Sequence, residues 1–196
     1  MKKIFILASL FITLSVSAQD INLPKPVTTG GMPLMEALSK RQSTREFSSE
    51  ALSNQTISNL LWAAWGYNRG DKRTAPSANN KQELELYVAL KSGAYRYDAK
   101  ANKLIQVTKE DIRSKTGRQD FVATAPLNIV YVADKSKDGA AQTDVGFIAQ
   151  NVYLFCASEN LATVVRGWFD AKVVKEALKL SDNFEPVLTQ TVGKKK

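Results

Sequence analysis

The chain has 196 residues, of which 44% are hydrophobic and 23% charged, a composition typical of one globular domain with a sizeable apolar core. It has no histidine and a single cysteine, which excludes histidine-based catalytic triads, histidine-ligated metals and an internal disulfide. Any catalysis therefore depends on carboxylates, lysines, hydroxyls or a bound cofactor, and no metal site is predicted.

The N-terminus has the pattern of a secretory signal peptide. Lys2 and Lys3 precede an apolar run from Ile4 to Val16, and small residues precede Gln19. The run is too short for a dependable membrane span, so we expect cleavage after residues 1–18, export to the periplasm and no stable membrane insertion. A buried N-terminal helix is the alternative. Loss of the two lysines lowers the net charge from +8 to +6.

Residues 19–31 contain prolines and adjacent glycines and predict an extended arm leading into one domain over residues 32–196. Pro33 suits the first turn of a helix that ends near Lys40. Further on, Ser53 or Asn54 is expected to cap a second helix, whose apolar stripe ends near Gly66.

Between these two helices, the stretch K-R-Q-S-T-R-E-F from Lys40 to Phe47 combines guanidinium groups with hydroxyls, which predicts an anion cradle. In a helix Arg41 and Arg45 would share a face, and in an extended segment Ser43 would join them. A solvated helix end is the alternative interpretation.

The rest of the chain alternates between strand and helix patterns. Tyr67 to Asn80 lacks periodicity and is predicted to be a long polar loop. After this loop we expect a strand at 83–91, a hairpin of strands at 94–97 and 103–107, and a short helix to about 115 capped by Thr108 and Asp111. A central strand at 127–133 and a helix at 144–160 follow. The last predicted elements are a strand at 162–165, a helix at 170–180 begun by Asp170, and a strand at 187–192.

The predicted helix at 144–160 has an apolar face too wide for a simple surface helix. We expect it to be buried on two sides, in the domain core or at a subunit interface. Cys156 lies among its apolar residues and is predicted to be a core residue rather than a nucleophile. Strands and helices interleave without a strict βαβ rhythm, so the fold class is α+β.

Three segments together resemble the nitroreductase family of FMN-dependent oxidoreductases. They are R-x-S-x-R at Arg41, P-S-A-N-N-K-Q at Pro76, and N-L-A-T-V-V-R-G-W-F-D at Asn160. The resemblance spans Pro33 to Gly193 and is closest to the branch of thiazoline- and oxazoline-forming dehydrogenases. It implies a nitroreductase-like fold, with a mostly antiparallel central sheet flanked by helices, and a domain-swapped homodimer with the flavin at its interface.

The same resemblance implies site residues for FMN. The phosphate and ring edge would contact Arg41, Gln42, Ser43 and Arg45, the second motif would contribute Pro76, Ser77, Asn79, Asn80 and Gln82, and the backbone N–H groups of Val165, Arg166 and Gly167 would face flavin N5 and O4. No side chain is predicted to be catalytic. The alternative interpretation of the second motif is a surface turn. Lys194 and Lys195 either complete the phosphate site or form a solvated tail.

Two further positions near the third motif have more than one possible role. Asn160 stands where relatives have glycine, and asparagine tolerates a left-handed backbone, so the turn is expected to survive. Trp168 and Phe169 fit packing in the core or a dimer as well as substrate stacking.

The function implied is hydride transfer from a reduced nicotinamide, NAD(P)H, through FMN to a nitroaromatic, a quinone or a similar small acceptor. The alternative is a flavin- or ligand-binding module of the same fold without turnover. The basic residues are scattered and not interleaved with aromatic residues, so no nucleic-acid partner is expected.

Overall fold

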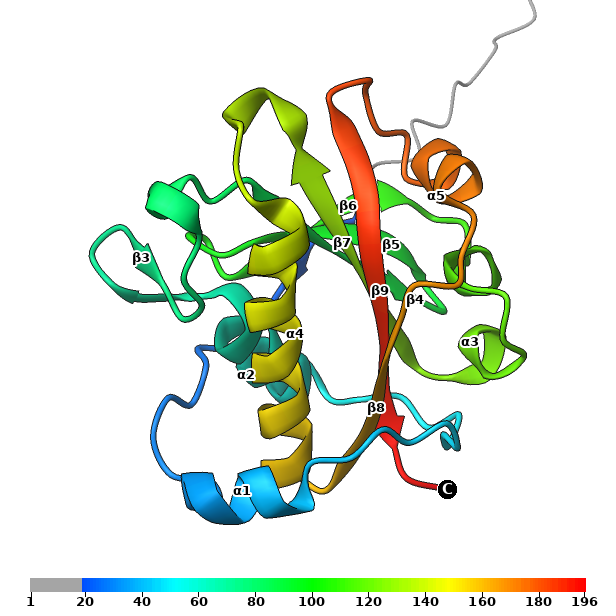
Figure 1. Ribbon diagram of the computed structural model, residues 1–196. Helices are drawn as coiled ribbons and strands as arrows, with labels where there is room; N and C mark the ends of the chain where they lie inside the picture. The colour runs from blue at the N-terminus through cyan, green and yellow to red at the C-terminus, as the bar shows by residue number, and fades with distance from the viewer. Residues whose placement is uncertain (1–18) are drawn as a thin grey trace, which may run out of the picture.

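The structure, a computed structural model, describes residues 19–196 (Figure 1). Its strands are β1 Ile21–Asn22, β2 Tyr67–Arg69, β3 Lys72–Arg73, β4 Leu84–Leu90, β5 Gly93–Asp98, β6 Lys103–Thr108, β7 Leu127–Asp134, β8 Leu161–Arg166 and β9 Phe184–Lys194. Its helices are α1 Leu34–Lys40, α2 Asn54–Trp65, α3 Phe121–Thr124, α4 Ala141–Ser158 and α5 Ala171–Ala177, with 3₁₀ turns η1 Ala78–Asn80, η2 Arg113–Thr116 and η3 Lys135–Lys137.

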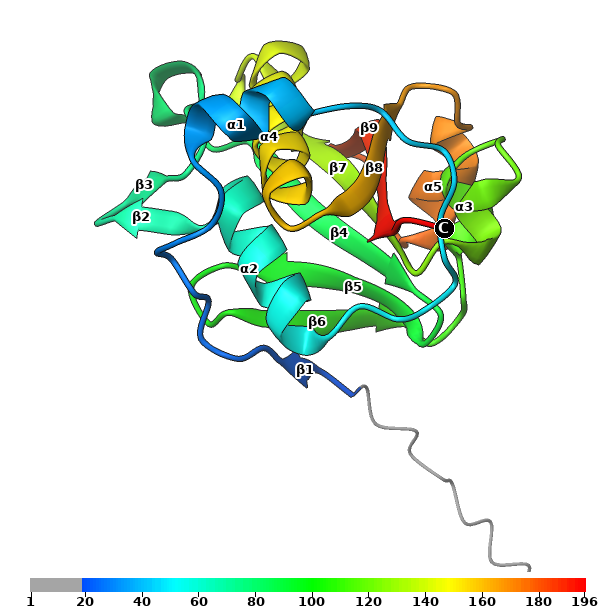
Figure 2. The same cartoon turned by 90° about the horizontal axis from the view of Figure 1, so that it is seen from below.

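Seven strands form one sheet in the order β1-β6-β5-β4-β7-β9-β8, and each neighbouring pair is antiparallel. A separate ribbon pairs β2 with β3. Helices α2 and α4 cover one face of the sheet, and α5 covers the other (Figure 2). This arrangement confirms the predicted α+β class with an antiparallel central sheet.

Hydrophobic cores lie on both faces of the sheet. Under α2 and α4, Leu60 and Ile148 pack against sheet residues such as Ile129, and all three are fully buried. Under α5, Val174 packs with Val130 of the central strand β7. Because both faces of β7 are covered, its sequence is apolar almost throughout, and this made it recognisable as a central strand.

The predicted N-terminal caps of two helices are confirmed. The Ser53 hydroxyl accepts the Thr56 N–H at 3.0 Å and begins α2, which ends at Gly66. The Asp170 carboxylate accepts two backbone N–H groups of the first turn of α5, at 3.1 and 3.2 Å. These bonds satisfy N–H groups that a helix terminus otherwise leaves unpaired.

Two local predictions are wrong. The segment from 67 to 80 is not a plain loop, because it contains the β2–β3 ribbon and η1. Thr108 ends β6 instead of capping a helix, and η2 begins without a side-chain cap. One side of α4 is buried in the core and Phe147 on the same helix is 45% exposed, so burial of its second side at a subunit interface stays a prediction.

Across residues 19–196, no helix is both long and apolar enough to cross a bilayer. The predicted signal peptide, residues 1–18, lies outside the described residues. Residues 19–31 contain the short strand β1, which pairs with β6 at the edge of the sheet.

Candidate functional site

A cavity of about 410 Å³ lies where α1 and α4 end and β8 begins. We call it the cation pocket, because its lining includes three cationic side chains and no carboxylate. The lining residues that matter here are Lys40, Arg41, Gln42, Tyr153, Asn160 and Lys195. Such a pocket has a positive potential that suits an anionic ligand.

Arg41 reaches this pocket because α1 stops at Lys40. Arg41 has extended dihedral angles (φ −58°, ψ 121°), and the chain after it runs beside β8, where the Thr44 N–H donates to the Thr163 carbonyl at 2.9 Å. Of the two geometries considered for the basic motif, the extended one is therefore correct. Its backbone is fixed by β8 and not by a continuing helix.

Tyr153 of α4 organises the floor of the cation pocket, and sequence analysis did not assign it a role. The Arg41 guanidinium lies 5.1 Å from the centre of its ring, within the range of a cation–π contact. Its hydroxyl bonds the Ser43 hydroxyl at 2.8 Å and accepts the Val165 N–H at 3.0 Å. The available signal was a tyrosine within an apolar helix face, because a buried phenol needs polar partners.

The C-terminal lysines occupy different places. Lys195 Nζ donates to Asn160 Oδ1 at 2.6 Å beside the cation pocket, and its backbone forms a β-bridge with Phe47. Lys194 ends β9 and pairs with Glu50. The backbones of both lysines are therefore paired in β-structure, and both side chains are exposed.

Two sequence expectations near the pocket have different outcomes. Asn160 is left-handed (φ 53°), which confirms the expectation that asparagine adopts this backbone conformation in the turn before β8. Arg45 does not join Arg41, because it lines a separate hollow with Phe121 and Lys196. The cation pocket thus gathers Arg41, Gln42 and Lys195, with Ser43 bound to Tyr153 at its floor.

The outer edge of β8, away from β9, ends in an open backbone donor. Arg166 is in register with Thr189 of β9, and its carbonyl accepts the Thr189 hydroxyl at 3.2 Å. Because the peptide is trans, the Gly167 N–H points away from β9. No acceptor within residues 19–196 receives this N–H, and a Cβ on Gly167 would meet nothing within 4 Å. Of the three predicted donors, Val165 is engaged by Tyr153, Arg166 is paired in register with β9, and Gly167 is free.

The Arg166 side chain supports the fold on the opposite side of β8. Its guanidinium is 4% exposed and donates to the Thr116 carbonyl at 2.9 Å and to Asn128 Oδ1 at 3.1 Å. Burial lowers the pKa of Arg166 to about 10, which still leaves the group charged at neutral pH. Arg166 therefore ties β8 to η2 and β7.

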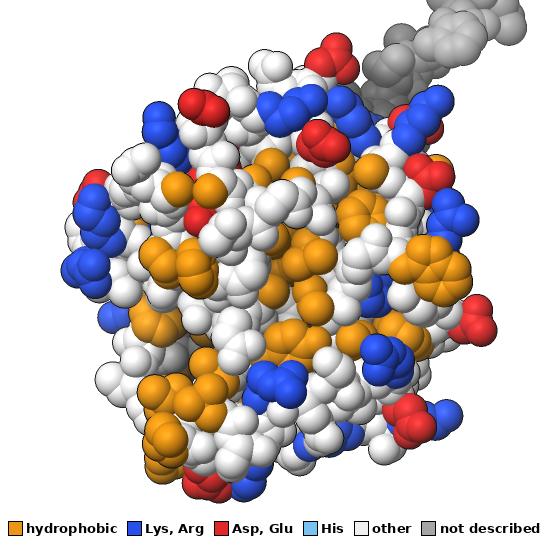
Figure 3. Space-filling view, viewed as in Figure 1, with side chains coloured by type: hydrophobic (Ala, Val, Ile, Leu, Met, Phe, Trp, Pro, Cys, Tyr) orange, Lys and Arg blue, Asp and Glu red, His pale blue; other side chains and the backbone are white. Residues whose placement is uncertain are grey.

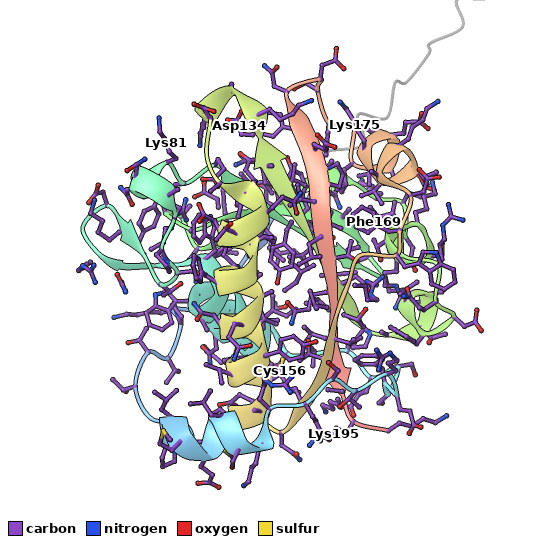
Figure 4. The ribbon with its side chains drawn as sticks, in the orientation of Figure 1. Lys81, Asp134, Cys156, Phe169, Lys175 and Lys195 are labelled. Carbon is purple, nitrogen blue, oxygen red and sulfur yellow. The ribbon has the colours of Figure 1, made fainter. Side chains whose placement is uncertain are left out.

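The second motif lies elsewhere on the same chain. The Ala78 N–H donates to Asp144 Oδ2 at 2.8 Å, at the first turn of α4, whereas Tyr153 and Cys156 line the pocket near its end. About 14 Å of helix axis separates Asp144 from Tyr153. Figure 4 shows Lys81, which lies within the motif, and Lys195 toward opposite ends of α4. One chain therefore does not bring the three predicted segments together.

Within that motif the backbone is tightly constrained. Asn79, Asn80 and Gln82 all have positive φ, near 50°, which residues other than glycine seldom adopt. The Gln82 amide accepts from Arg73 at 2.9 Å and donates to the Asp71 carbonyl at 2.7 Å. The segment is a surface turn, as the alternative interpretation held, and it is also held in a strained conformation of the kind common at functional sites.

Cys156 is fully buried, which confirms the prediction of a core cysteine. Burial raises the pKa of its thiol far above the ordinary range, so the reactive thiolate is not formed at neutral pH. Within residues 19–196 no group of three or more aspartate, glutamate or cysteine side chains is arranged to hold a metal ion.

Glu83 is a buried carboxyl directly after the second motif. Its side chain is 1% exposed, and neither oxygen has a hydrogen-bond partner among the described residues. Burial is the main cause that raises the pKa of Glu83, the neighbouring Asp144 adds to it, and Lys137 opposes it. The folded protein therefore holds a proton here more tightly than the unfolded chain does.

We expect Glu83→Gln to change the free energy of unfolding more favourably near pH 8 than near pH 4. The difference between the two changes should be about 1 to 3 kcal/mol. Because the folded-state pKa of Glu83 is raised, its stabilising contribution is present below the ordinary carboxyl pKa and is lost as the pH rises through the raised value. Glutamine does not titrate, so the variant avoids this loss. Urea unfolding at the two pH values measures the difference.

The matched control is Glu85→Gln in β4, two residues further along the chain, where the partly exposed carboxylate lies 3.9 Å from Arg96 and accepts the Tyr87 hydroxyl at 3.0 Å, a bond that the glutamine oxygen can still accept. Its effect should stay within about 0.5 kcal/mol at both pH values. Equal effects of Glu83→Gln at the two pH values would contradict the assignment of a raised pKa to the buried Glu83.

Comparison with known proteins identifies the family. The sequence profile described as "Nitroreductase family" matches residues 38–194. A nitroreductase-family protein of Methanocaldococcus jannaschii is 32% identical over 183 residues, which cover 83% of this chain and 91% of the relative. A crystal structure of a nitroreductase-family protein from Ralstonia eutropha JMP134 is 42% identical, with a TM-score of 0.85 and 90% of each chain covered. An FMN-dependent nitroreductase from Clostridium difficile R20291 is 22% identical, with a TM-score of 0.61 over 83% of this chain and 87% of its own, a likeness of fold alone. The chain therefore belongs to the nitroreductase family.

Proposed function

We propose that the protein is an FMN-dependent oxidoreductase that binds the flavin phosphate in the cation pocket. The observation that carries the proposal is that Arg41 and Lys195 line one cavity whose lining has no carboxylate. Guanidinium and ammonium groups bind phosphate through charge-assisted hydrogen bonds. The choice of FMN as the cofactor is supported by the sequence motifs and by the similarity in fold to the FMN-dependent nitroreductase of Clostridium difficile.

Gly167 is the residue that would donate to the flavin ring. Its N–H has no acceptor within residues 19–196, and the open space beside Gly167 permits close approach of a planar ligand. About 13 Å of extended chain separates Thr163, at the pocket, from Gly167, so an elongated ligand with a phosphate at one end suits this edge of β8. Bound FMN supplies hydride transfer between NAD(P)H and a nitroaromatic, quinone or similar acceptor, and the chain supplies binding and orientation.

A second copy of the chain would complete the site. Asn80 and Gln82 lie too far along α4 to reach the cation pocket of their own chain, so we propose a domain-swapped homodimer in which they contact the partner's flavin. Exposed apolar side chains support this. They lie over α1 and along α4 (Figure 3) and include Leu34 (62% exposed), Met35 (76%), Leu38 (43%) and Phe147 (45%).

Two finer expectations rest on the sequence alone. The resemblance to the thiazoline- and oxazoline-forming branch rests on the motifs at Arg41, Pro76 and Asn160. Export to the periplasm rests on the signal-peptide pattern of residues 1–18. An exported enzyme would need an electron donor available outside the cytoplasm, so the donor is best sought among several reductants.

Titration of the purified protein with FMN tests the proposal. Binding at micromolar FMN should quench flavin fluorescence, and anaerobic stopped-flow mixing with NADH or NADPH should then bleach the bound flavin. Bound flavin that no reductant bleaches faster than buffer would instead support a binding module without turnover. A folded protein that binds no FMN would exclude both functions.

A further inference from the structure

Trp168 presents a free indole on a fixed backbone. Its side chain is 62% exposed, whereas Trp65 is 2% exposed and donates its indole N–H to a backbone carbonyl. The Trp168 carbonyl accepts the Arg118 N–H at 3.2 Å, and the Asp170 carboxylate caps α5 immediately afterwards. The backbone is therefore held on both sides of an indole that no core packing retains.

The neighbouring aromatic residue shows why the exposure is built into the chain path. Phe169 packs against the core beneath α5 (Figure 4), and its N–H donates to the Gly167 carbonyl at 3.2 Å in a tight turn. Phe169 is packed inward in this turn, whereas Trp168, the residue before it, is exposed. The Arg166 bonds to Thr116 and Asn128 hold the start of this turn.

Arg118, whose backbone bonds to Trp168, brings a positively charged side chain to the same turn. Arg118 approaches Asp170 at 3.6 Å, but the two side chains are 56% and 45% exposed. An exposed ion pair of this kind contributes little to stability, so the Arg118 guanidinium can also bind another anionic group. An anionic group on a ligand stacked on the Trp168 indole could therefore bind Arg118 through charge-assisted hydrogen bonds.

We propose that Trp168 and Arg118 form the binding site for the oxidising substrate, and that this substrate is a planar aromatic compound with an anionic group, such as a nitrobenzoate. The inference rests on the proposed function, because it makes use of the position of Trp168 directly after Gly167, the backbone donor assigned to the flavin. The indole provides a stacking face, and Arg118 selects negatively charged aromatic compounds over neutral ones.

The experiment is isothermal titration of the protein, with FMN present, with 4-nitrobenzoate and separately with nitrobenzene. Trp168→Ala should weaken binding of both compounds about tenfold, whereas Trp168→Phe should retain most of the affinity. Arg118→Met should weaken binding of 4-nitrobenzoate about tenfold and leave nitrobenzene unchanged. In turnover assays Trp168→Ala should raise KM for 4-nitrobenzoate with little change in kcat.

Equal affinities in the wild type, Trp168→Ala and Trp168→Phe would overturn the inference while leaving FMN binding intact. A change of molecular mass in Trp168→Ala would also overturn it, because the indole would then belong to a subunit contact. Failure of FMN to bind is a separate result that removes the proposed function. In that case the titration of the protein with 4-nitrobenzoate still decides whether Trp168 and Arg118 bind this class of compound.

Discussion

Replacing both Arg41 and Lys195 with methionine is expected to weaken FMN binding at least about a hundredfold without unfolding the protein. Each side chain lines the cation pocket, and a charged hydrogen bond to phosphate contributes about 1.5 to 3 kcal/mol, or roughly tenfold to a hundredfold in affinity. Methionine keeps a long apolar stem and removes the charge. Flavin fluorescence titration measures the dissociation constant, and urea unfolding checks the fold.

The control removes the same charge from residues outside the pocket. Arg45→Met and Lys194→Met together should weaken FMN binding by no more than about threefold, because Arg45 lines a different hollow and Lys194 pairs with Glu50. The sequence motif alone assigns Arg45 to the phosphate site, so this pair of variants separates the sequence interpretation from the geometric one. Equal losses in the two double variants would show that net charge, and not the cation pocket, governs binding.

Elements with strong local signals could be predicted from the sequence. Ser53 and Asp170 cap helices through bonds to residues two or three positions away, so the necessary information is local. The left-handed Asn160 follows from its side chain in the same way. The central strand β7 and helix α4 have long apolar patterns that admit few other interpretations.

The missed features depend on contacts between distant segments. The β2–β3 ribbon has little local preference, and Arg73 stabilises it by lying 4.9 Å from the Trp65 ring and 4.1 Å from the Tyr67 ring. Likewise, the hydrogen bonds of Tyr153 join segments far apart in sequence, and no periodicity encodes them. A motif alone cannot predict that Ser43 bonds to a tyrosine, so the contacts that hold this pocket together could not be predicted from the motif.

Met35→Glu is expected to convert a homodimer into a monomer, with a dimer dissociation constant raised at least about a hundredfold, and to abolish tight FMN binding at the same time. Met35 is 76% exposed in one chain, so glutamate there should leave the monomer fold intact. At an apolar subunit interface the same carboxylate would be buried without a partner, which costs several kcal/mol. Analytical ultracentrifugation and FMN titration of the same samples measure both effects.

Val173→Glu provides the matched control, because Val173 is an exposed apolar residue (39%) on α5, across the sheet from α1. It should preserve both the dimer and flavin affinity. If Met35→Glu stays dimeric, α1 is not the interface. If it becomes a monomer that still binds FMN tightly, Asn80 and Gln82 of the partner are not required, and the cation pocket and Gly167 of one chain suffice. Loss of dimer and flavin together is the result that a site shared between two copies requires, since only a second copy can bring the strained turn at Asn80 near the pocket at Arg41.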